Sequence, residues 1–419
     1  MKRELKRVVV TGMGVISPIG NSLNEFWSNL ISGKSGVGSI TKFDTTHFKT
    51  KFAAEVKNFE PNKYFERNEA RKYDLFTQYA LAVTDEAITN AGIDFEKVNR
   101  NKVGVIWGSG NGGIQTFQEQ VEEFVVNGRK PRFNPYFIPK MIADIPSGVI
   151  SIRYGSRGLN FSTVSACASS ANAMIDALNY IRLGHCDVIV TGGSEAAVAY
   201  AGVGGFNAMH ALSTRNESPE TASRPFDAER DGFVLGEGSG AIILEEYEHA
   251  KARGAKIYAE VIGGGMSSDA YHMTAPHPEG LGVIAVMKNC LENSGINPED
   301  VDHINTHGTS TPLGDVAELK AISSVFGDHA KNININSTKS MTGHLLGAAG
   351  AIESIASILA MKHGIVPPTI NHSNIDENIN PDLNLTLNKA QKREINVAMS
   401  NTFGFGGHNA CVAFRKLEE

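Results

Sequence analysis

Short apolar runs alternate with longer segments of helical periodicity along most of the chain. The runs are rich in Val and Ile, whereas Ala, Leu, Ile and Met recur at helical spacing in the segments between them. The expected strands are 7–11, 103–107, 159–164, 188–191, 240–245, 257–263, 301–305, 333–337, 397–401 and 410–414. The expected helices are 23–32, 74–91, 168–183, 281–293, 316–325 and 345–363. This alternation predicts an α/β fold with largely buried sheets.

A charged segment at 246–255 divides the pattern into two similar series of strands and helices. We therefore predict two similar halves, residues 1–255 and 256–419. The predicted repeat is one of topology, because the two halves share little sequence similarity.

Composition sets limits on function. Hydrophobic residues make up 41% and charged residues 20% of the 419 positions, which is typical of a globular protein, and the net charge of -6 argues against nucleic acid as the main partner. The four cysteines form no CxxC pair, so neither a zinc ribbon nor a dithiol redox motif is expected, and scattered thiols fit a reducing cytoplasm. No apolar run reaches about 18 residues, so neither a membrane span nor a signal peptide is expected.

Two glycine-rich motifs do not carry the functions that their patterns suggest. Residues 108–113 (GSGNGG) satisfy GxGxxG after a strand, but no strand ending in an acid follows about 20 residues later. Residues 192–196 (GGSEA) are one residue short of a hydrolase nucleophile elbow. Nucleotide binding and serine hydrolysis are therefore disfavoured.

Cys167 lies between an expected strand and an expected helix, within residues 165–169 (SACAS). A cysteine at such a junction faces the positive end of the helix dipole, which favours the nucleophilic thiolate. The small neighbours let another molecule approach. A small buried residue is the alternative interpretation, and position alone leaves both open.

Two further motifs place histidines after expected strands. In residues 305–315 (NTHGTSTPLGD), His307 stands where a strand enters a turn rich in Gly and Thr, a position that commonly carries function. In residues 336–350 (NSTKSMTGHLLGAAG), Lys339 and His344 flank a turn. A buried lysine keeps a neighbouring histidine neutral, and a neutral imidazole can donate one hydrogen bond to a carbonyl oxygen. The structural alternative for His307 is a histidine fixed by turn hydroxyls.

The last motif, residues 401–409 (NTFGFGGHN), links the two C-terminal strands. Its three glycines free the backbone to present N–H groups, and its two aromatic residues close over apolar space. The alternative interpretation is a β-hairpin with an aromatic plug.

These motifs occur in the order of one family. Residues 165–169, His307-Gly308-Thr309, Lys339 with Gly343-His344, and 404–407 (GFGG) resemble β-ketoacyl-[acyl carrier protein] synthases, most closely type II of bacterial fatty-acid synthesis. The resemblance runs from about Arg7 to Phe414. The Cys-His-His set separates the chain from chain-initiating synthases, which are Cys-His-Asn, and from thiolases, which carry a second cysteine near the C-terminus.

The resemblance implies a thiolase-like, five-layer αβαβα fold of two similar halves with mixed sheets. It also implies an acyltransferase that condenses malonyl carrier protein, with loss of carbon dioxide, with an acyl chain held on Cys167. No organic cofactor and no metal is expected. The implied partners are acyl- and malonyl-loaded acyl carrier protein and a second copy of the chain, with no nucleic acid or membrane.

The resemblance assigns a role to each motif residue. The N–H groups of Cys167 and Phe405 form the oxyanion hole, and Phe405 also acts as a gate. His307 and His344 stabilise the charge that develops during decarboxylation, and Lys339 orients them. The supporting residues are Glu353 in the same network, Thr309 and Thr311 for the pantetheine arm, and Gly404, Gly406 and Gly407 in the loop.

Carrier protein is acidic, so a basic docking surface is expected. One candidate patch contains Arg67, Arg71 and Lys72, and the other contains Arg129, Lys130 and Arg132. Charge runs are more commonly solvated faces, and that alternative stays open.

Two residues depart from the family pattern. Asn111 stands where many type II members have an apolar residue lining the acyl pocket, and a polar residue there changes the preferred chain length. His210 stands near the position where family members often have an arginine that helps to receive the carrier, so docking there is expected to depend on pH. Three alternatives remain: a ketosynthase of a polyketide or aryl-polyene pathway, a non-catalytic chain-length partner, and a cysteine hydrolase. Retention of Cys167 with two histidines disfavours the last two.

Overall fold

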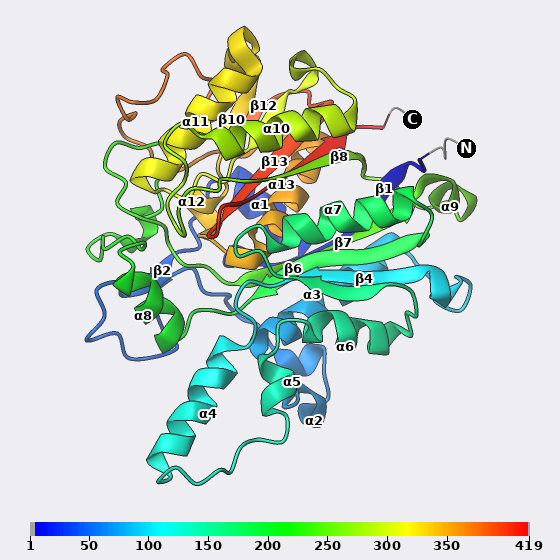
Figure 1. Ribbon diagram of the computed structural model, residues 1–419, viewed down its shortest axis with the longest axis vertical. Coiled ribbons are helices and arrows are strands. Elements are labelled where there is room, and N and C mark those ends of the chain that lie inside the picture. Colours follow the sequence, from blue (N-terminus) through cyan, green and yellow to red (C-terminus); the bar gives the residue numbers. More distant parts are fainter. Residues whose placement is uncertain (1–4, 418–419) are drawn as a thin grey trace.

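The structure is a computed structural model that describes residues 5–417, and its centre is a mixed ten-stranded sheet (Figure 1). The sheet strands are β1 (Val8–Ile16), β4 (Val103–Gly108), β5 (Asn160–Thr163), β6 (Val188–Glu195), β7 (Gly238–Glu246), β8 (Ala259–Ser268), β9 (His303–Asn305), β10 (Asn334–Asn336), β13 (Val397–Gly404) and β14 (His408–Arg415). Short strands β2 (Gly38–Ser39), β3 (Phe52–Ala53), β11 (Ile365–Val366) and β12 (Gln391–Lys392) form two separate ribbons. All ten expected strands are present.

The longer helices are α1 (Leu23–Ile31), α3 (Leu75–Ala91), α4 (Ile114–Val126), α6 (Ile145–Tyr154), α7 (Ser169–Arg182), α8 (Tyr200–Ala208), α10 (Leu281–Ser294), α11 (Pro312–Phe326) and α13 (Ala349–His363). The shorter ones are α2 (Arg67–Ala70), α5 (Phe137–Met141), α9 (Tyr247–Ala252) and α12 (Lys339–Thr342). The six expected helices are confirmed, with ends that shift by a few residues. None of the helices among residues 5–417 is long and apolar enough to cross a membrane.

The two halves of the sheet have the same topology. From the centre outwards, the first half runs β1-β7-β6-β4-β5 and the second runs β8-β14-β13-β9-β10. In each half the first two pairings are antiparallel and the last two are parallel. Counted in chain order within its half, each series reads 1-5-4-2-3, so the predicted internal repeat is present. The exact division at residues 255 and 256 stays a prediction.

Helices lie between the two halves of the sheet and on the outer face of each half (Figure 1). Helices α3 and α6 pack on the outer face of the first half, and α10 packs on the second half beside α11. Helices α7 and α13 contact strands of both halves, and they share the largest apolar cluster with Val10, Ile242 and Val412. These contacts give the five-layer αβαβα arrangement. They also bring the N-terminal end of α7, after Cys167, close to the turn that precedes α13.

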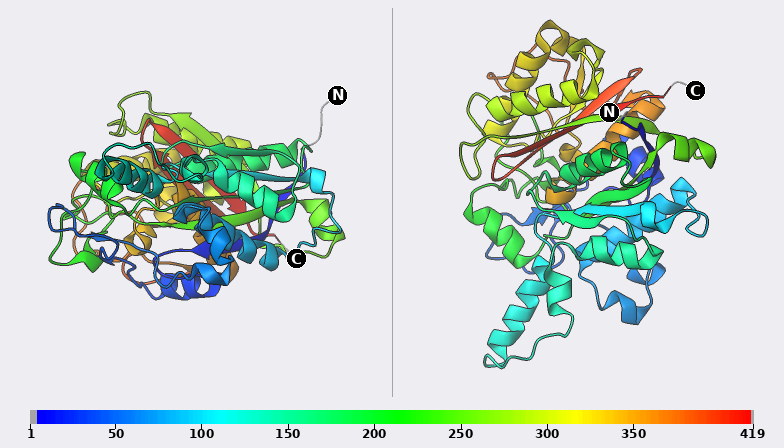
Figure 2. Two further views of the ribbon diagram at one scale, coloured as in Figure 1. Left: turned by 90° about the horizontal axis from the view of Figure 1, so that it is seen from below. Right: turned by 45° about the vertical axis from the view of Figure 1, so that its right-hand side comes forward.

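The hydrophobic pattern did not reveal α4, α5, α6 or α8. Helix α8 contains three glycines, and α6 contains Pro146 in its first turn, so both have low intrinsic helix propensity. Helices α4 and α5 project from the body (Figures 1 and 2), and α4 buries only Thr116, so it shows no core-facing stripe.

The prediction that β8 ends at Gly263 is wrong, because the strand continues to Ser268 through three glycines. A Cβ on Gly265 would lie 2.3 Å from the carbonyl oxygen of Val286 in α10. The glycines therefore allow α10 to pack directly on the strand, which the sequence alone does not distinguish from a loop.

Candidate active site

Cys167 stands in a tight turn at the N-terminal end of α7 and is 7% exposed. The preceding residue, Ala166, has a φ of 50°, which is unfavourable for any residue other than glycine. The hydroxyl of Ser169 holds this turn, since it accepts from the N–H of Ser165 at 3.0 Å and donates to the carbonyl of Ala166 at 2.7 Å. The strand-to-helix junction thus presents the sulfur in a strained and well-fixed position.

The cysteine and the two histidines meet in one cavity of about 620 Å³. The Nε2 atom of His344 lies 3.0 Å from the Sγ atom of Cys167. The ring of His307 stands nearly perpendicular to that of His344, with centroids 5.1 Å apart. The Cys167 Sγ atom and one ring nitrogen from each histidine all lie within 4.8 Å of one another. A reacting carbonyl group bound at the sulfur is therefore within reach of both imidazoles.

Burial controls the charge of the nucleophile. It raises the pKa of the Cys167 thiol to about 12, although Lys339 and the backbone N–H groups of Phe405 and Cys167 oppose this rise. Removal of the sulfur from water therefore outweighs the stabilisation of the thiolate that the helix N-terminus is expected to give. His344 Nε2 lies within hydrogen-bond distance of this sulfur, so the ring can donate to the sulfur and stabilise the charge that develops there as it reacts.

Both histidines are held neutral. Burial lowers the pKa of His307 and of His344 well below the usual value, and the Lys339 ammonium lowers each further. Lys339 is itself 1% exposed and forms an ion pair with Glu353 on α13. Lys339 and Glu353 therefore form one buried ion pair, and its ammonium acts on both rings.

A second buried carboxylate, Glu318 on α11, holds the strand end that carries His307. It accepts hydrogen bonds from the N–H of His307 at 2.9 Å, from the N–H of Gly308 at 2.8 Å and from Asn401 Nδ2 at 3.1 Å. Burial raises its pKa to about 7, and these donors oppose the rise. Glu318 could not be singled out from the sequence, where its only signal is an acid among Ala and Leu on a helix after the His307 motif.

The glycine-rich loop forms the hairpin turn between β13 and β14 and lies against the nucleophile. A Cβ on Gly404 would lie 2.8 Å from the carbonyl oxygen of Ser165 and 3.1 Å from the nitrogen of Cys167, so only glycine allows this approach. Gly406 and Gly407 have φ values of 86° and 74°, and the N–H of Gly406 donates to the carbonyl of Met273 at 2.8 Å. The loop thereby places the Phe405 N–H at the sulfur, where its donation lowers the thiol pKa.

The turn after His307 is fixed by buried charges. The Thr309 and Thr311 hydroxyls lie 3.1 Å apart and line the cavity. Arg230 donates to the carbonyl of Thr311 at 3.0 Å, and Asp315 accepts from the N–H of Ser310 at 3.1 Å. These contacts hold the two hydroxyls against the cavity.

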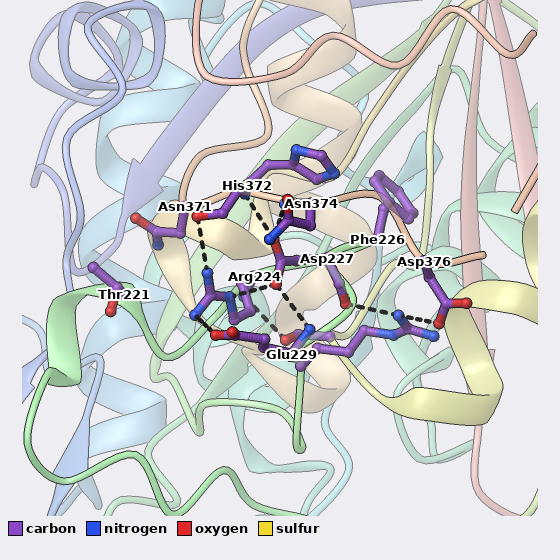
Figure 3. Close-up of polar contacts among 12 residues, drawn as sticks. Thr221, Arg224, Phe226, Asp227, Glu229, Asn371, His372, Asn374 and Asp376 are labelled. Carbon is purple, nitrogen blue, oxygen red and sulfur yellow. Dashed lines mark hydrogen bonds and ion pairs between the residues drawn. The ribbon is translucent and has the colours of Figure 1, made fainter. Parts of the chain in front are cut away.

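A network of ion pairs reinforces the same segment, and Figure 3 shows the part of it around Arg224, Asp227 and Asp376. Arg224 pairs with Asp227 at 3.0 Å, and Arg230 pairs with Asp376 at 2.7 Å. Asp227 also accepts from the N–H of Ser373 at 2.7 Å. The network joins the loop before β7 to the chain that follows β11, so the cavity wall is tied to two distant segments.

The predicted docking residues lie apart from the cavity. Arg67, Arg71 and Lys72 lie in or after α2, and Arg129, Lys130 and Arg132 follow α4; all six are exposed. None of them forms an ion pair within residues 5–417. Asn111 and His210 both line the cavity.

The cavity residues fit a metal ion poorly. Cys167, His307 and His344 form the one group among the described residues whose Cys, His or acidic donor atoms could hold a metal ion, and zinc prefers such ligands. The Lys339 ammonium, however, lowers the pKa of both rings and so disfavours any further positive charge beside them. The arrangement suits an acyl transfer in which the sulfur attacks and two neutral imidazoles donate hydrogen bonds.

Two family models match the chain, the N-terminal domain of beta-ketoacyl synthase over residues 5–250 and the C-terminal domain over residues 258–373. The chain belongs to the β-ketoacyl synthase family. It is 47% identical over 414 residues to 3-oxoacyl-[acyl-carrier-protein] synthase 2 of Coxiella burnetii, with 99% of both chains covered. It is 46% identical over 417 residues to the Synechocystis protein of the same name, again with 99% coverage of both chains.

Solved structures of this synthase family agree with the fold. A beta-ketoacyl synthase from Burkholderia phymatum superposes with a TM-score of 0.91 at 34% identity, covering 99% of this chain and 100% of that one. A type II polyketide ketosynthase in complex with its acyl-carrier protein has a TM-score of 0.90 at 33% identity with the same coverage. The predicted thiolase-like fold and the class of acyl-transferring condensing enzyme are confirmed. The curated relatives favour the fatty-acid elongating enzyme over the polyketide and chain-length-partner alternatives.

Proposed function

We propose that this synthase elongates acyl chains by two carbons, with Cys167 as the nucleophile and the two histidines as the decarboxylation centre. The contact between His344 Nε2 and Cys167 Sγ at 3.0 Å, with His307 beside it in the same cavity, is the observation that carries this proposal. A cysteine hydrolase needs only one imidazole beside its sulfur, so the second ring favours condensation over hydrolysis.

In the first step the sulfur attacks the thioester carbonyl of an acyl chain on acyl carrier protein. The thiol proton passes to the pantetheine sulfur, which leaves as a thiol. The oxyanion that forms is stabilised by the N–H groups of Cys167 and Phe405, whose donation toward the sulfur supports this role. The chain is then held as a thioester on Cys167.

In the second step the malonyl group of malonyl carrier protein occupies the same cavity. The C–C bond between its methylene carbon and its carboxylate breaks. Carbon dioxide leaves, and the electron pair forms an enolate whose oxygen accepts hydrogen bonds from His307 and His344. The enolate carbon attacks the acyl carbonyl, and the Cys167 sulfur leaves as a thiolate that takes up a proton from water to restore the thiol. Burial and the Lys339 ammonium keep both rings neutral, and each neutral ring can donate one hydrogen bond.

The pantetheine arm and the growing chain need separate parts of the cavity. Thr309 and Thr311 supply hydroxyls for the arm, while Gly110 and Asn111 form the wall beside the nucleophile turn. An amide at Asn111 disfavours long apolar chains there.

We expect the protein to act in the cytoplasm, as four unpaired cysteines indicate a reducing compartment.

A condensation assay with purified protein tests this function. Malonyl carrier protein and a ladder of acyl carrier proteins should give 3-oxoacyl carrier two carbons longer, with a preference that falls as the acyl chain lengthens. Release of free fatty acid without elongated product would instead identify a cysteine hydrolase.

We expect charge reversal of Arg129 and Lys130 to Glu to lower kcat/KM for acyl carrier protein about tenfold at low ionic strength, since exposed charges steer an acidic partner. The loss should shrink as salt is added. The matched control reverses the exposed Lys288 and Lys320, which lie on α10 and α11 at the opposite end of the molecule (Figure 1). Equal losses in both variants would contradict docking at this patch.

We also propose that the protein is a homodimer that pairs through β5. This strand is one edge of the sheet, and Val164 directly after it is 62% exposed. An open edge with exposed apolar residues commonly pairs with another chain. Sedimentation at micromolar concentration should give twice the 45.0 kDa mass of the chain, whereas a monomer at that concentration would contradict pairing.

A further inference from the structure

A buried carboxylate beside the nucleophile takes no part in the steps above. Glu195 is the last residue of β6, and its side chain is fully buried. Within residues 5–417 no Lys or Arg forms an ion pair with it, and all its polar contacts are to N–H groups and a hydroxyl. A buried carboxylate without a cation is costly, so its presence at this position calls for a reason.

The hydrogen bonds of Glu195 join two separate segments of the cavity wall. Its carboxylate accepts from the N–H of Gly110, from the N–H of Asn111 at 3.1 Å and from Asn111 Nδ2 at 3.4 Å. It also accepts from the N–H of Gly347, three residues after His344. The acid therefore bridges the β4–α4 turn and the turn that carries the histidine.

The two segments pack tightly on this carboxylate. A Cβ on Gly347 would lie 2.7 Å from Glu195 Oε1 and 2.4 Å from the nitrogen of Gly110. Leu346, next to Gly347, lines the cavity with a φ of 49°, a conformation that the surroundings must maintain. A Cβ on Gly110 would also lie 3.3 Å from the carbonyl oxygen of Ala166, so the nucleophile turn rests on the same contact.

We propose that Glu195 is a positioning residue that fixes the Gly110–Asn111 wall and the turn after His344 relative to Cys167. The inference rests on the proposed function, because that wall is the surface against which the acyl chain lies. Loss of the bridge frees both turns and weakens the seating of long chains more than that of short ones.

The ionised form of Glu195 makes the stronger hydrogen bonds in the bridge, whereas burial favours its protonated form. Hydrogen bonds to a carboxylate are about twice as strong as those to a neutral acceptor. Burial raises the pKa of Glu195 to about 7, although the hydrogen bonds from the N–H groups lower it. Because this pKa lies above the value in the unfolded chain, the group stabilises the fold at low pH, and that contribution is lost as pH rises through about 7.

Two substitutions separate the bridge from simple packing. Glu195→Ala leaves three backbone N–H groups without an acceptor, whereas Glu195→Gln keeps an acceptor oxygen without the charge. The matched control is Glu86→Ala in α3, because Glu86 likewise accepts from two backbone N–H groups, those of Val15 and Leu23, both at 2.9 Å. Glu86 does not line the cavity.

Single-turnover acylation of Cys167 and amide hydrogen exchange are measured on all three variants. We expect Glu195→Ala to slow acylation by a long chain about tenfold more than by a short one, with partial recovery in Glu195→Gln. Exchange at residues 108–113 and 345–349 should accelerate about tenfold or more in Glu195→Ala and stay near wild type in Glu86→Ala. Glu195→Gln should also lose part of the pH dependence of unfolding between about pH 5 and 7.

Equal exchange in both alanine variants, or equal losses for short and long chains, would overturn the proposal. If the wild-type protein forms no acyl-enzyme, the proposed function fails, and the exchange result alone then decides whether Glu195 joins the two turns.

Discussion

Replacement of Cys167 by Gln is expected to abolish condensation, with a loss on the order of 10⁴-fold or more, because no covalent acyl-enzyme can form. The sulfur is the nucleophile at the base of the cavity and lies 3.0 Å from His344. Decarboxylation of malonyl carrier protein needs the histidines and not the sulfur, so it should persist or rise in this variant. Steady-state condensation and carbon dioxide release are measured on the same preparation.

Cys186 provides the control for this substitution. It is fully buried and does not line the cavity, so Cys186→Ala should keep condensation within a few-fold of wild type. Substantial condensation by the Cys167→Gln protein would show that another group holds the chain. Loss of decarboxylation together with condensation would show that the substitution disturbs the histidines, and Cys167→Ala would then be measured instead.

Replacement of His344 by Ala is expected to reduce decarboxylation by about 10²- to 10³-fold, because it removes a hydrogen-bond donor from the developing enolate. Acylation of Cys167 should slow by less than about tenfold, since the reacting carbonyl is stabilised by backbone N–H groups that the substitution leaves in place. Replacement of His307 by Ala should lose decarboxylation similarly with a smaller effect on acylation, as His344 is the ring that contacts the sulfur.

His303 is the matched control for the histidine variants. It lies on the same strand as the His307 motif, is fully buried and bonds Asn336 at 2.9 Å, but does not line the cavity. His303→Gln should therefore lower stability without a selective loss of decarboxylation. If His344→Ala decarboxylates at the wild-type rate, the role assigned to that ring is wrong.

The fold could be predicted because apolar positions recur with the periods of strands and helices. The apolar runs 103–107 in β4, 188–190 in β6 and 240–244 in β7 have no polar interruption, and α7 and α13 carry apolar residues on most faces because they lie between the two halves. Helices α6 and α8 could not be predicted, since contacts with the rest of the protein outweigh their proline and glycines. Tertiary packing, rather than local propensity, decides those segments.

The site was predictable only where a residue type is itself informative. Cys167, His307, His344 and Lys339 stand in motifs that mark strand ends and turns. Glu195 and Glu318 do not, because a single acid within an apolar element cannot be distinguished in the sequence from a polar surface residue. Only the folded structure shows that both side chains are buried.

The protonation state of the nucleophile also depends on the folded structure. The sequence indicates a helix N-terminus, which favours a thiolate, but burial of the sulfur raises its pKa to about 12. The extent of burial depends on β13 and the glycine-rich loop, which lie more than two hundred residues further along the chain.

Intact mass of the purified protein after incubation with one acyl carrier protein tests the central claim most directly. The account predicts that the protein gains one acyl mass, that peptide mapping places it on Cys167, and that it disappears when malonyl carrier protein is added while an elongated 3-oxoacyl carrier forms. An unmodified Cys167, or an acyl group that leaves only as free acid, would contradict it.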